Sequence, residues 1–262
     1  FVRDFEKAIG KKFGCRYTQC TSSGSSALFC SLKALGIGAG DEVITQAHNF
    51  IATVEAINLL GAKCVICPIN DSLNMDAAAL PELISDKTKA IVPVHMLGVY
   101  ADLDEISKVA NDFDVPIVED CCEAVGAKYG GGCLGRSSVI TVHSYDYGKN
   151  ITTGEGGAIL TNNEQLYRAV RAIHDHGHSY EKPFDRGNDP ISTAGFNFRM
   201  TELSGAVGLV QLKKLDKILD MNRKRYRVLL DCFSAHGLNA FVRPVPVGAE
   251  PSYDTFIFQC TS

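Results

Sequence analysis

The sequence predicts an α/β protein in which helices cover both faces of a mostly parallel sheet. Two observations predict this fold class. Short apolar runs typical of buried strands alternate with longer segments of helical periodicity. Polar residues gather directly after several apolar runs, and in such sheets ligands bind at the carboxyl ends of the strands. We therefore expect a binding site along one edge of the sheet.

The expected elements follow from this alternation. A Ser/Gly segment, residues 23–26, is typical of the N-cap of a helix. In chain order we expect strands at 42–45, 62–67, 89–94, 115–118, 139–142 and 158–161, and helices at 27–32, 53–60, 103–110 and 164–173.

The pattern changes after Met200. Residues 201 to about 233 predict one long helical stretch, and residues 237–262 open another unit with one strand at 255–259 and no visible partner strand. We therefore expect a large domain at 1–233 and the start of a truncated small α+β domain at 234–262.

Composition limits the class of protein. With 262 residues, 45% of them hydrophobic and 21% charged, the chain can bury a core. Its net charge of -4 does not favour a nucleic-acid or membrane-surface partner. No apolar run approaches the ~18 residues of a membrane span. The chain begins with Phe1 rather than methionine, so no targeting signal can be read from it.

The ten cysteines do not predict a metal or disulfide framework. Cys64 and Cys67 have CxxC spacing, but residues three apart on a strand face opposite sides of the sheet. No second CxxC or histidine pair completes a site, so we expect no metal. Free cysteines within apolar runs favour a reducing, cytoplasmic compartment.

One polar segment, residues 143–157, carries the most informative chemistry. It places Lys149 close to four glycines, directly after the apolar run 138–142. Upstream, Asp120 ends another apolar run and the Ser/Gly segment 23–26 opens a helix. A lysine can form a Schiff base, a carboxylate can pair with a pyridine nitrogen, and a helix start can bind phosphate. Together these groups suit pyridoxal 5'-phosphate.

Each of these residues also has an ordinary structural alternative. Lys149 could be a solvated loop charge, and Asp120 could cap the next turn. Glu123 could hydrogen-bond the ring hydroxyl of the cofactor or be a charge on a helix face. The serines of 23–26 could cap a helix whether or not they bind phosphate, because both roles use the same N–H groups.

In chain order, the motifs resemble one family. They are Ser23–Leu28, Gly40–Ile44, Val118–Asp120, Lys149–Gly157 and Gly195–Met200. This series resembles the DegT/DnrJ/StrS family of pyridoxal-phosphate sugar aminotransferases. The resemblance implies the three-layer α/β/α architecture of fold type I and a homodimer.

The resemblance also implies a role for eight residues, with two departures. Ser25 and Ser26 stand where the family commonly has threonine followed by a variable residue, a change that keeps the hydroxyl. Glu123 stands where the family often has glutamine or histidine. The implied roles are Schiff-base formation for Lys149, the ring nitrogen for Asp120, phosphate binding for Gly24, Ser25 and Ser144, ring stacking for Phe50, the ring hydroxyl for Glu123, and the neighbouring subunit's phosphate for Asn197.

The implied reaction is amino transfer, with glutamate as the expected donor, to a keto or aldehyde sugar. The sugar could be nucleotide-linked or a keto-sugar acid, used in cell-surface polysaccharide (lipopolysaccharide) or secondary-metabolite biosynthesis. One branch of the family carries histidine in place of the lysine and dehydrates the sugar; Lys149 argues against that alternative. A non-enzymatic cofactor-binding regulator is a second alternative. Because family members are longer, we expect this chain to be a fragment.

Overall fold

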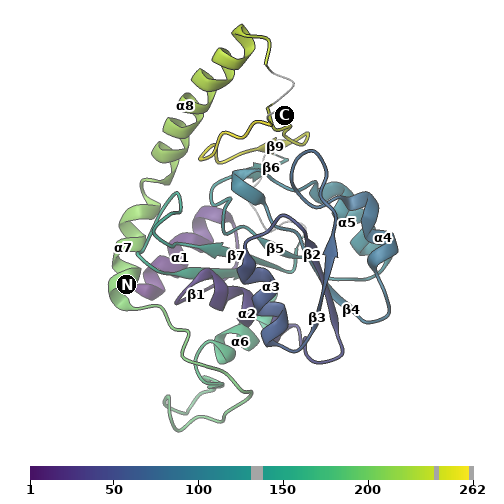
Figure 1. Ribbon diagram of the computed structural model, residues 1–262. Coiled ribbons are helices and arrows are strands. Elements are labelled where there is room, and N and C mark those ends of the chain that lie inside the picture. Colours follow the sequence, from purple (N-terminus) through teal and green to yellow (C-terminus); the bar gives the residue numbers. More distant parts are fainter. Residues whose placement is uncertain (131–137, 239–241, 260–262) are drawn as a thin grey trace.

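A twisted sheet with helices on both faces forms the centre of the computed structural model (Figure 1), which describes residues 1–130, 138–238 and 242–259. Four strands follow the order β1-β8-β7-β5 and three follow the order β3-β2-β4. Two isolated parallel bridges, Ile91–Ile117 and Val94–Asp120, connect the three-stranded group at β4 to the four-stranded group at β5. The strands are β1 (Tyr17–Thr21), β2 (Glu42–Gln46), β3 (Lys63–Cys67), β4 (Thr88–Val92), β5 (Val118–Asp120), β7 (Ile140–Ser144) and β8 (Gly157–Thr161).

The sheet is mostly parallel, as predicted. The pairs β2–β3, β2–β4 and β5–β7 are parallel, whereas β8 runs antiparallel to both β1 and β7. The helices are α1 (Val2–Phe13), α2 (Gly24–Ala34), α3 (Ile51–Leu59), α4 (Leu80–Leu83), α5 (Leu103–Asp112), α6 (Glu164–Ile173), α7 (Glu202–Leu212) and α8 (Leu215–Ala235), with 3₁₀ turns η1 (Ala77–Ala79) and η2 (Met96–Gly98).

Two layers of helices sandwich the sheet because successive strand residues point to opposite faces. In β2, Val43 joins the buried cluster of α2, α3 and α6, whereas Ile44 joins the cluster of α4 and α5. In β8, Ile159 packs toward α2, whereas Leu160 packs toward α1 and α7. The three-layer architecture is therefore confirmed.

The CxxC pair obeys the same rule. Cys64 packs against the cluster of α2 and α3, and Cys67 lies buried in the cluster of α4 and α5. The two thiols therefore lie on opposite faces, as predicted, and cannot share a metal.

Two expected elements of the large domain differ in the structure. The strand expected at 115–118 is observed at Val118–Asp120, because Pro116 has no N–H to donate to a ladder. The long helical stretch expected at 201–233 is observed but divided, since α7 ends at Leu212 and α8 begins at Leu215. Helix α1 and strand β1 were not predicted. Strand β1 is hidden because it buries Thr18, Gln19 and Thr21 together with Cys20.

The strand expected at Thr255–Gln259 is also wrong. Within the described residues, Phe258 forms an isolated bridge with Val242, and the aromatic side chains pack on α8 instead of entering a sheet. The rings of Phe256 and Phe258 both contact Phe233. Phe258 nevertheless remains 48% exposed. Figure 1 shows this C-terminal segment between α8 and the body of the molecule, where β9 (Ala249–Glu250) pairs with β6 (Lys128–Tyr129).

The domain division at residue 233 stays a prediction. Helix α8 continues through this position to Ala235. Among the described residues, none of the helices is long and apolar enough to cross a membrane.

Candidate active site

The carboxyl ends of β5 and β7 and the start of α2 meet around a cavity of about 440 Å³. The polar residues that follow these strands in the sequence predicted a binding site at this position. Seven of the eight residues expected in the site line this cavity. They are Gly24, Ser25, Phe50, Asp120, Glu123, Ser144 and Lys149.

The first turn of α2 forms one wall. Ser23 is the N-cap: its Oγ accepts from the Ser26 N–H at 3.1 Å, and its own N–H donates to Ser26 Oγ at 3.0 Å. Among the described residues, no protein acceptor pairs with the N–H groups of Gly24 and Ser25. Unpaired donors at a helix N-terminus suit an anion. The predicted N-cap is therefore confirmed, and the same turn can bind phosphate.

Gly24 permits the close approach of α2 to β7. A Cβ atom at this position would lie 2.9 Å from Ser144 Cβ and 3.1 Å from Cys122 Sγ. Both contacts are shorter than side-chain carbons normally allow, so glycine is required by packing rather than by an unusual backbone angle.

Asp120 is buried at the end of β5, with 3% of its surface exposed. The Thr53 hydroxyl donates to its Oδ2 at 2.7 Å, and the Cys122 backbone N–H donates to its Oδ1 at 3.1 Å. Asp120 therefore caps the following turn, as the structural alternative required, and also faces the cavity. The two roles coexist because a carboxylate oxygen can accept more than one hydrogen bond.

Lys149 and Glu123 face each other across the cavity. The Lys149 Nζ lies 3.7 Å from Glu123 Oε1, and each side chain is about one-fifth exposed, at 20% and 18%. Glu123 lies in a turn region and not on a helix, so the helix-face alternative is wrong. Lys149 is paired with a carboxylate and is not a freely solvated charge.

A strained turn fixes the other oxygen of Glu123. The Leu97 N–H donates to Glu123 Oε2 at 3.0 Å, and Leu97 has a φ of 49°, which is uncommon for a side chain of its size. Buried Arg243 supports this turn by donating to the Met96 carbonyl at 2.8 Å, and burial lowers the pKa of its guanidinium to about 10. Asn74 Oδ1 accepts from the Met96 N–H at 3.1 Å.

Three titratable side chains near the cavity, Cys122, His143 and Tyr145, stay neutral. Burial, together with the nearby Asp120, raises the pKa of the Cys122 thiol well above its ordinary value. Burial also lowers the pKa of His143 to about 3 and raises that of Tyr145. The Cys122 thiol that lines the cavity therefore remains protonated and is a poor nucleophile.

Sequence reasoning missed Thr53, Leu97 and Arg243. Thr53 bonds an acid 67 positions away, and no local pattern indicates such a contact. The positive φ of Leu97 likewise has no sequence signal. The isolated Arg243 among prolines was a possible clue, because an arginine can donate to several carbonyl groups at once.

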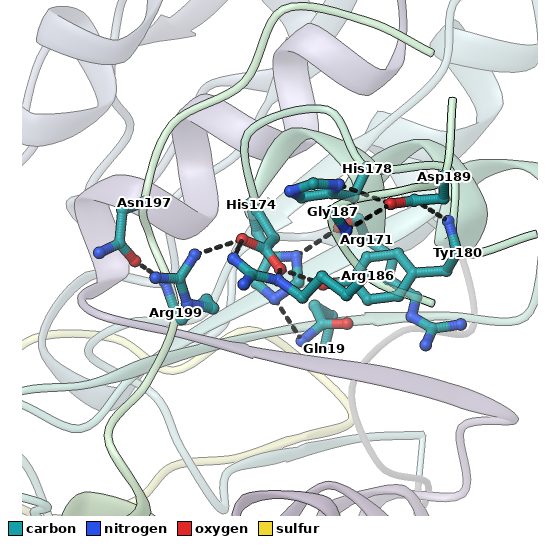
Figure 2. A network of polar contacts seen from close by, with 11 residues as sticks. Gln19, Arg171, His174, His178, Tyr180, Arg186, Gly187, Asp189, Asn197 and Arg199 are labelled. Atoms are coloured by element: carbon teal, nitrogen blue, oxygen red, sulfur yellow. Dashed lines mark hydrogen bonds and ion pairs between the residues drawn. The ribbon is translucent and has the colours of Figure 1, made fainter. Parts of the chain in front are cut away.

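Asn197 lies outside this cavity. It is exposed and pairs with Asp175 in an isolated antiparallel bridge. Figure 2 shows Asn197 and Arg199 at one end of a polar network that continues through Arg186 toward His178 and Asp189. The hub of the network is buried Asp175, whose carboxylate accepts from Arg186, Tyr180 and Arg199. Hydrogen bonding from Arg186 is the main reason that the pKa of Asp175 lies below its usual range.

The fold and the cavity place this chain in the class of fold-type-I pyridoxal-phosphate proteins. The model of the DegT/DnrJ/EryC1/StrS aminotransferase family matches residues 1–258, and the chain belongs to this family. The family and fold predicted from the sequence are therefore confirmed.

Individual relatives agree with this assignment. The chain is 40% identical over 221 residues to GDP-perosamine synthase of Caulobacter vibrioides, covering 84% of this chain and 58% of the relative. It is 32% identical over 255 residues to GDP-4-keto-6-deoxy-D-mannose 3-dehydratase of Escherichia coli O55:H7, covering 90% and 66%. A solved E. coli GDP-4-keto-6-deoxy-D-mannose-3-dehydratase with bound hydrated PLP superimposes with a TM-score of 0.90, at 31% identity over 100% of this chain and 72% of that chain. The chain thus spans about three-fifths of the curated synthase.

Proposed function

We propose that the protein is a pyridoxal-phosphate-dependent aminotransferase that transfers an amino group from glutamate to a keto or aldehyde sugar. One observation carries the proposal. Lys149, Asp120 and the unpaired N–H groups at the start of α2 converge on one cavity of about 440 Å³. These are the three kinds of group that the cofactor requires.

The residues present fit the cofactor. The N–H groups of Gly24 and Ser25, with the Ser25 and Ser144 hydroxyls, offer donors for its phosphate. Asp120 offers a fixed negative charge that would keep a pyridine nitrogen protonated. Phe50 lines the cavity with 63% of its surface exposed and would cover one face of the ring. These site assignments are part of the proposal.

Among the residues of this chain, Lys149 would take part directly in the reaction. When bound, the cofactor supplies an aldehyde and an electron-withdrawing ring. The Nζ of Lys149 would hold the aldehyde covalently and, when released, would accept or donate a proton at the substrate carbon. Glu123 would orient Nζ, from which its Oε1 lies 3.7 Å away.

The relatives suggest the class of sugar. Two relatives, 40% and 35% identical, are named GDP-perosamine synthase. We propose that the amino acceptor is a nucleotide-linked keto sugar. The first candidate to test is a GDP-linked 4-keto-6-deoxy sugar. Its product would serve cell-surface polysaccharide synthesis. Keto-sugar acids are the second class of acceptor to test.

A sugar dehydratase is the second candidate function. The 32% identity to GDP-4-keto-6-deoxy-D-mannose 3-dehydratase favours it. Lys149 favours amino transfer instead, because the dehydratase branch of the family carries histidine at this position.

We further propose a homodimer in the cytoplasm. Asn197 is exposed and does not line the cavity of its own chain, so it is free to contact the site of a second copy. The eight described cysteines are all free, which supports a reducing compartment. We assign residues 1–233 to the cofactor-binding domain and 234–262 to the start of the small domain.

The test is product analysis with glutamate and a panel of keto sugars. An amino sugar plus 2-oxoglutarate supports the proposal, and loss of water from the sugar supports the dehydratase. Bound cofactor without turnover of any sugar indicates the regulator. Borohydride reduction followed by peptide mapping should label Lys149, and a label on another lysine would contradict the site. Lys149→Ala is the control and should remain folded but lose the label.

A further inference from the structure

Glu123 places a negative charge beside the nitrogen atom of Lys149, where a glutamine would be neutral. Its Oε1 lies 3.7 Å from Lys149 Nζ, and both side chains are largely removed from solvent. Among the described residues, no other carboxylate forms an ion pair with Lys149. The charge is therefore directed at the atom that would bond to the cofactor.

The second oxygen of Glu123 is fixed by the backbone. The Leu97 N–H donates to Oε2 at 3.0 Å, within the turn that Asn74 and Arg243 hold at Met96. The carboxylate can neither rotate away from Lys149 nor exchange this contact for water without losing that bond.

The other charged groups around Lys149 are engaged elsewhere. Both oxygens of Asp120 accept hydrogen bonds, and Asp146 Oδ1 accepts from the Gly148 N–H at 2.8 Å. Asp254 Oδ1 accepts from the Ser252 hydroxyl at 2.7 Å. Three further titratable groups line the cavity: the Cys122 thiol, which stays neutral, and the exposed side chains of Tyr147 and Glu155.

We propose that Glu123 is the counter-ion of the Schiff-base nitrogen on Lys149 and keeps that nitrogen protonated through the neutral pH range. The inference deepens the proposed function and rests on it. With the cofactor bound, the Lys149 amine would condense with its aldehyde with loss of one water, and the nitrogen would take one proton from solvent. An ionised carboxylate at this distance favours the positively charged nitrogen. A protonated nitrogen makes the adjoining carbon more reactive toward the incoming amino donor.

The experiment is a pH titration of the visible absorption band of the cofactor-bound protein. Glu123→Gln keeps the oxygen that accepts from Leu97 and removes the charge. We expect its midpoint to fall by about one to three pH units, the shift that an opposite charge within 4–6 Å produces. Glu155→Gln is the matched control, since it removes a carboxylate that lines the same cavity without an ion pair to Lys149. Its midpoint should stay unchanged.

Glu123→Asp is the second variant, because it retains the charge and should restore most of the wild-type midpoint. An unchanged midpoint in Glu123→Gln, with Lys149 labelled by borohydride, overturns this inference alone. Equal shifts in Glu123→Gln and Glu155→Gln also overturn it, because they would indicate a general field. Failure of borohydride to label Lys149 in the wild-type protein overturns the proposed function as well.

Discussion

At the scale of single residues, the bond from Thr53 to Asp120 matters most for the site. The Thr53 side chain is fully buried and donates to Oδ2 at 2.7 Å. We expect Thr53→Val to lower stability by about 1–3 kcal/mol, the cost of an unsatisfied buried acceptor. Turnover should fall as well, because the carboxylate loses its fixed orientation. Denaturant unfolding and steady-state rates measure the two effects. Thr53→Ser keeps the hydroxyl and should retain most turnover; equal losses in both variants would contradict the orienting role.

Glu6 gives a pH dependence of stability. Burial raises its pKa from 4.5 to about 7, although the Cys20 N–H donates to its carboxylate at 2.8 Å. Between these pH values the folded state binds more protons than the unfolded state, so stability falls as pH rises. The contribution is fully present below about pH 4.5 and is lost as pH passes about 7.

The loss amounts to at most about 3 kcal/mol. Glu6→Gln should flatten the unfolding free energy over this pH range. A wild-type stability that rises steadily through the range, with no difference from Glu6→Gln, would show that Glu6 does not titrate in this way.

At the scale of elements, the approach of α2 to β7 depends on Gly24. Gly24→Ala would place Cβ 2.9 Å from Ser144 Cβ, so the start of α2 must shift. We expect a stability loss of about 1–3 kcal/mol and weaker cofactor binding, because the phosphate donors move with the helix. Thermal unfolding and cofactor titration measure these effects. Gly38→Ala is the control, since nothing lies within 4 Å of its Cβ position. Cofactor affinity equal to wild type in Gly24→Ala would separate the helix start from the phosphate site.

The secondary-structure elements show which parts of the fold can be predicted from the sequence and which cannot. The apolar run Gly157–Thr161 is readable because every residue in it is buried, and the helix Glu164–Ile173 is readable because burial of one face imposes a period of 3.6. Strand β1 is not readable because its buried residues include polar Thr18 and Gln19, and the Gln19 amide is paired with Glu6 and with distant His174. The eight candidate site residues came from motifs. Their mutual contacts, such as Leu97 to Glu123, depend on chain segments brought together only by folding.

At the scale of the whole molecule, the position of Asn197 predicts a shared active site. If Asn197 completes the site of the neighbouring subunit, Lys149→Ala and Asn197→Ala chains should complement each other. In a mixed dimer, one site then carries both substitutions and the other site carries neither. Random pairing of equal amounts should restore about one-quarter of the wild-type sites, because half of the dimers are mixed and each has one intact site.

Co-refolding the two inactive chains and measuring amino transfer tests this expectation. Each variant alone provides the baseline, and wild-type protein treated in the same way gives the upper limit. If Asn197 acted within its own chain, every site in the mixed dimer would carry one substitution and mixing would restore nothing. Recovery above the baseline would therefore require both a dimer and a segment that crosses between subunits. The anchoring of Arg199 and Arg186 on buried Asp175 suits such a segment, because it fixes the backbone beside exposed Asn197 before a partner binds.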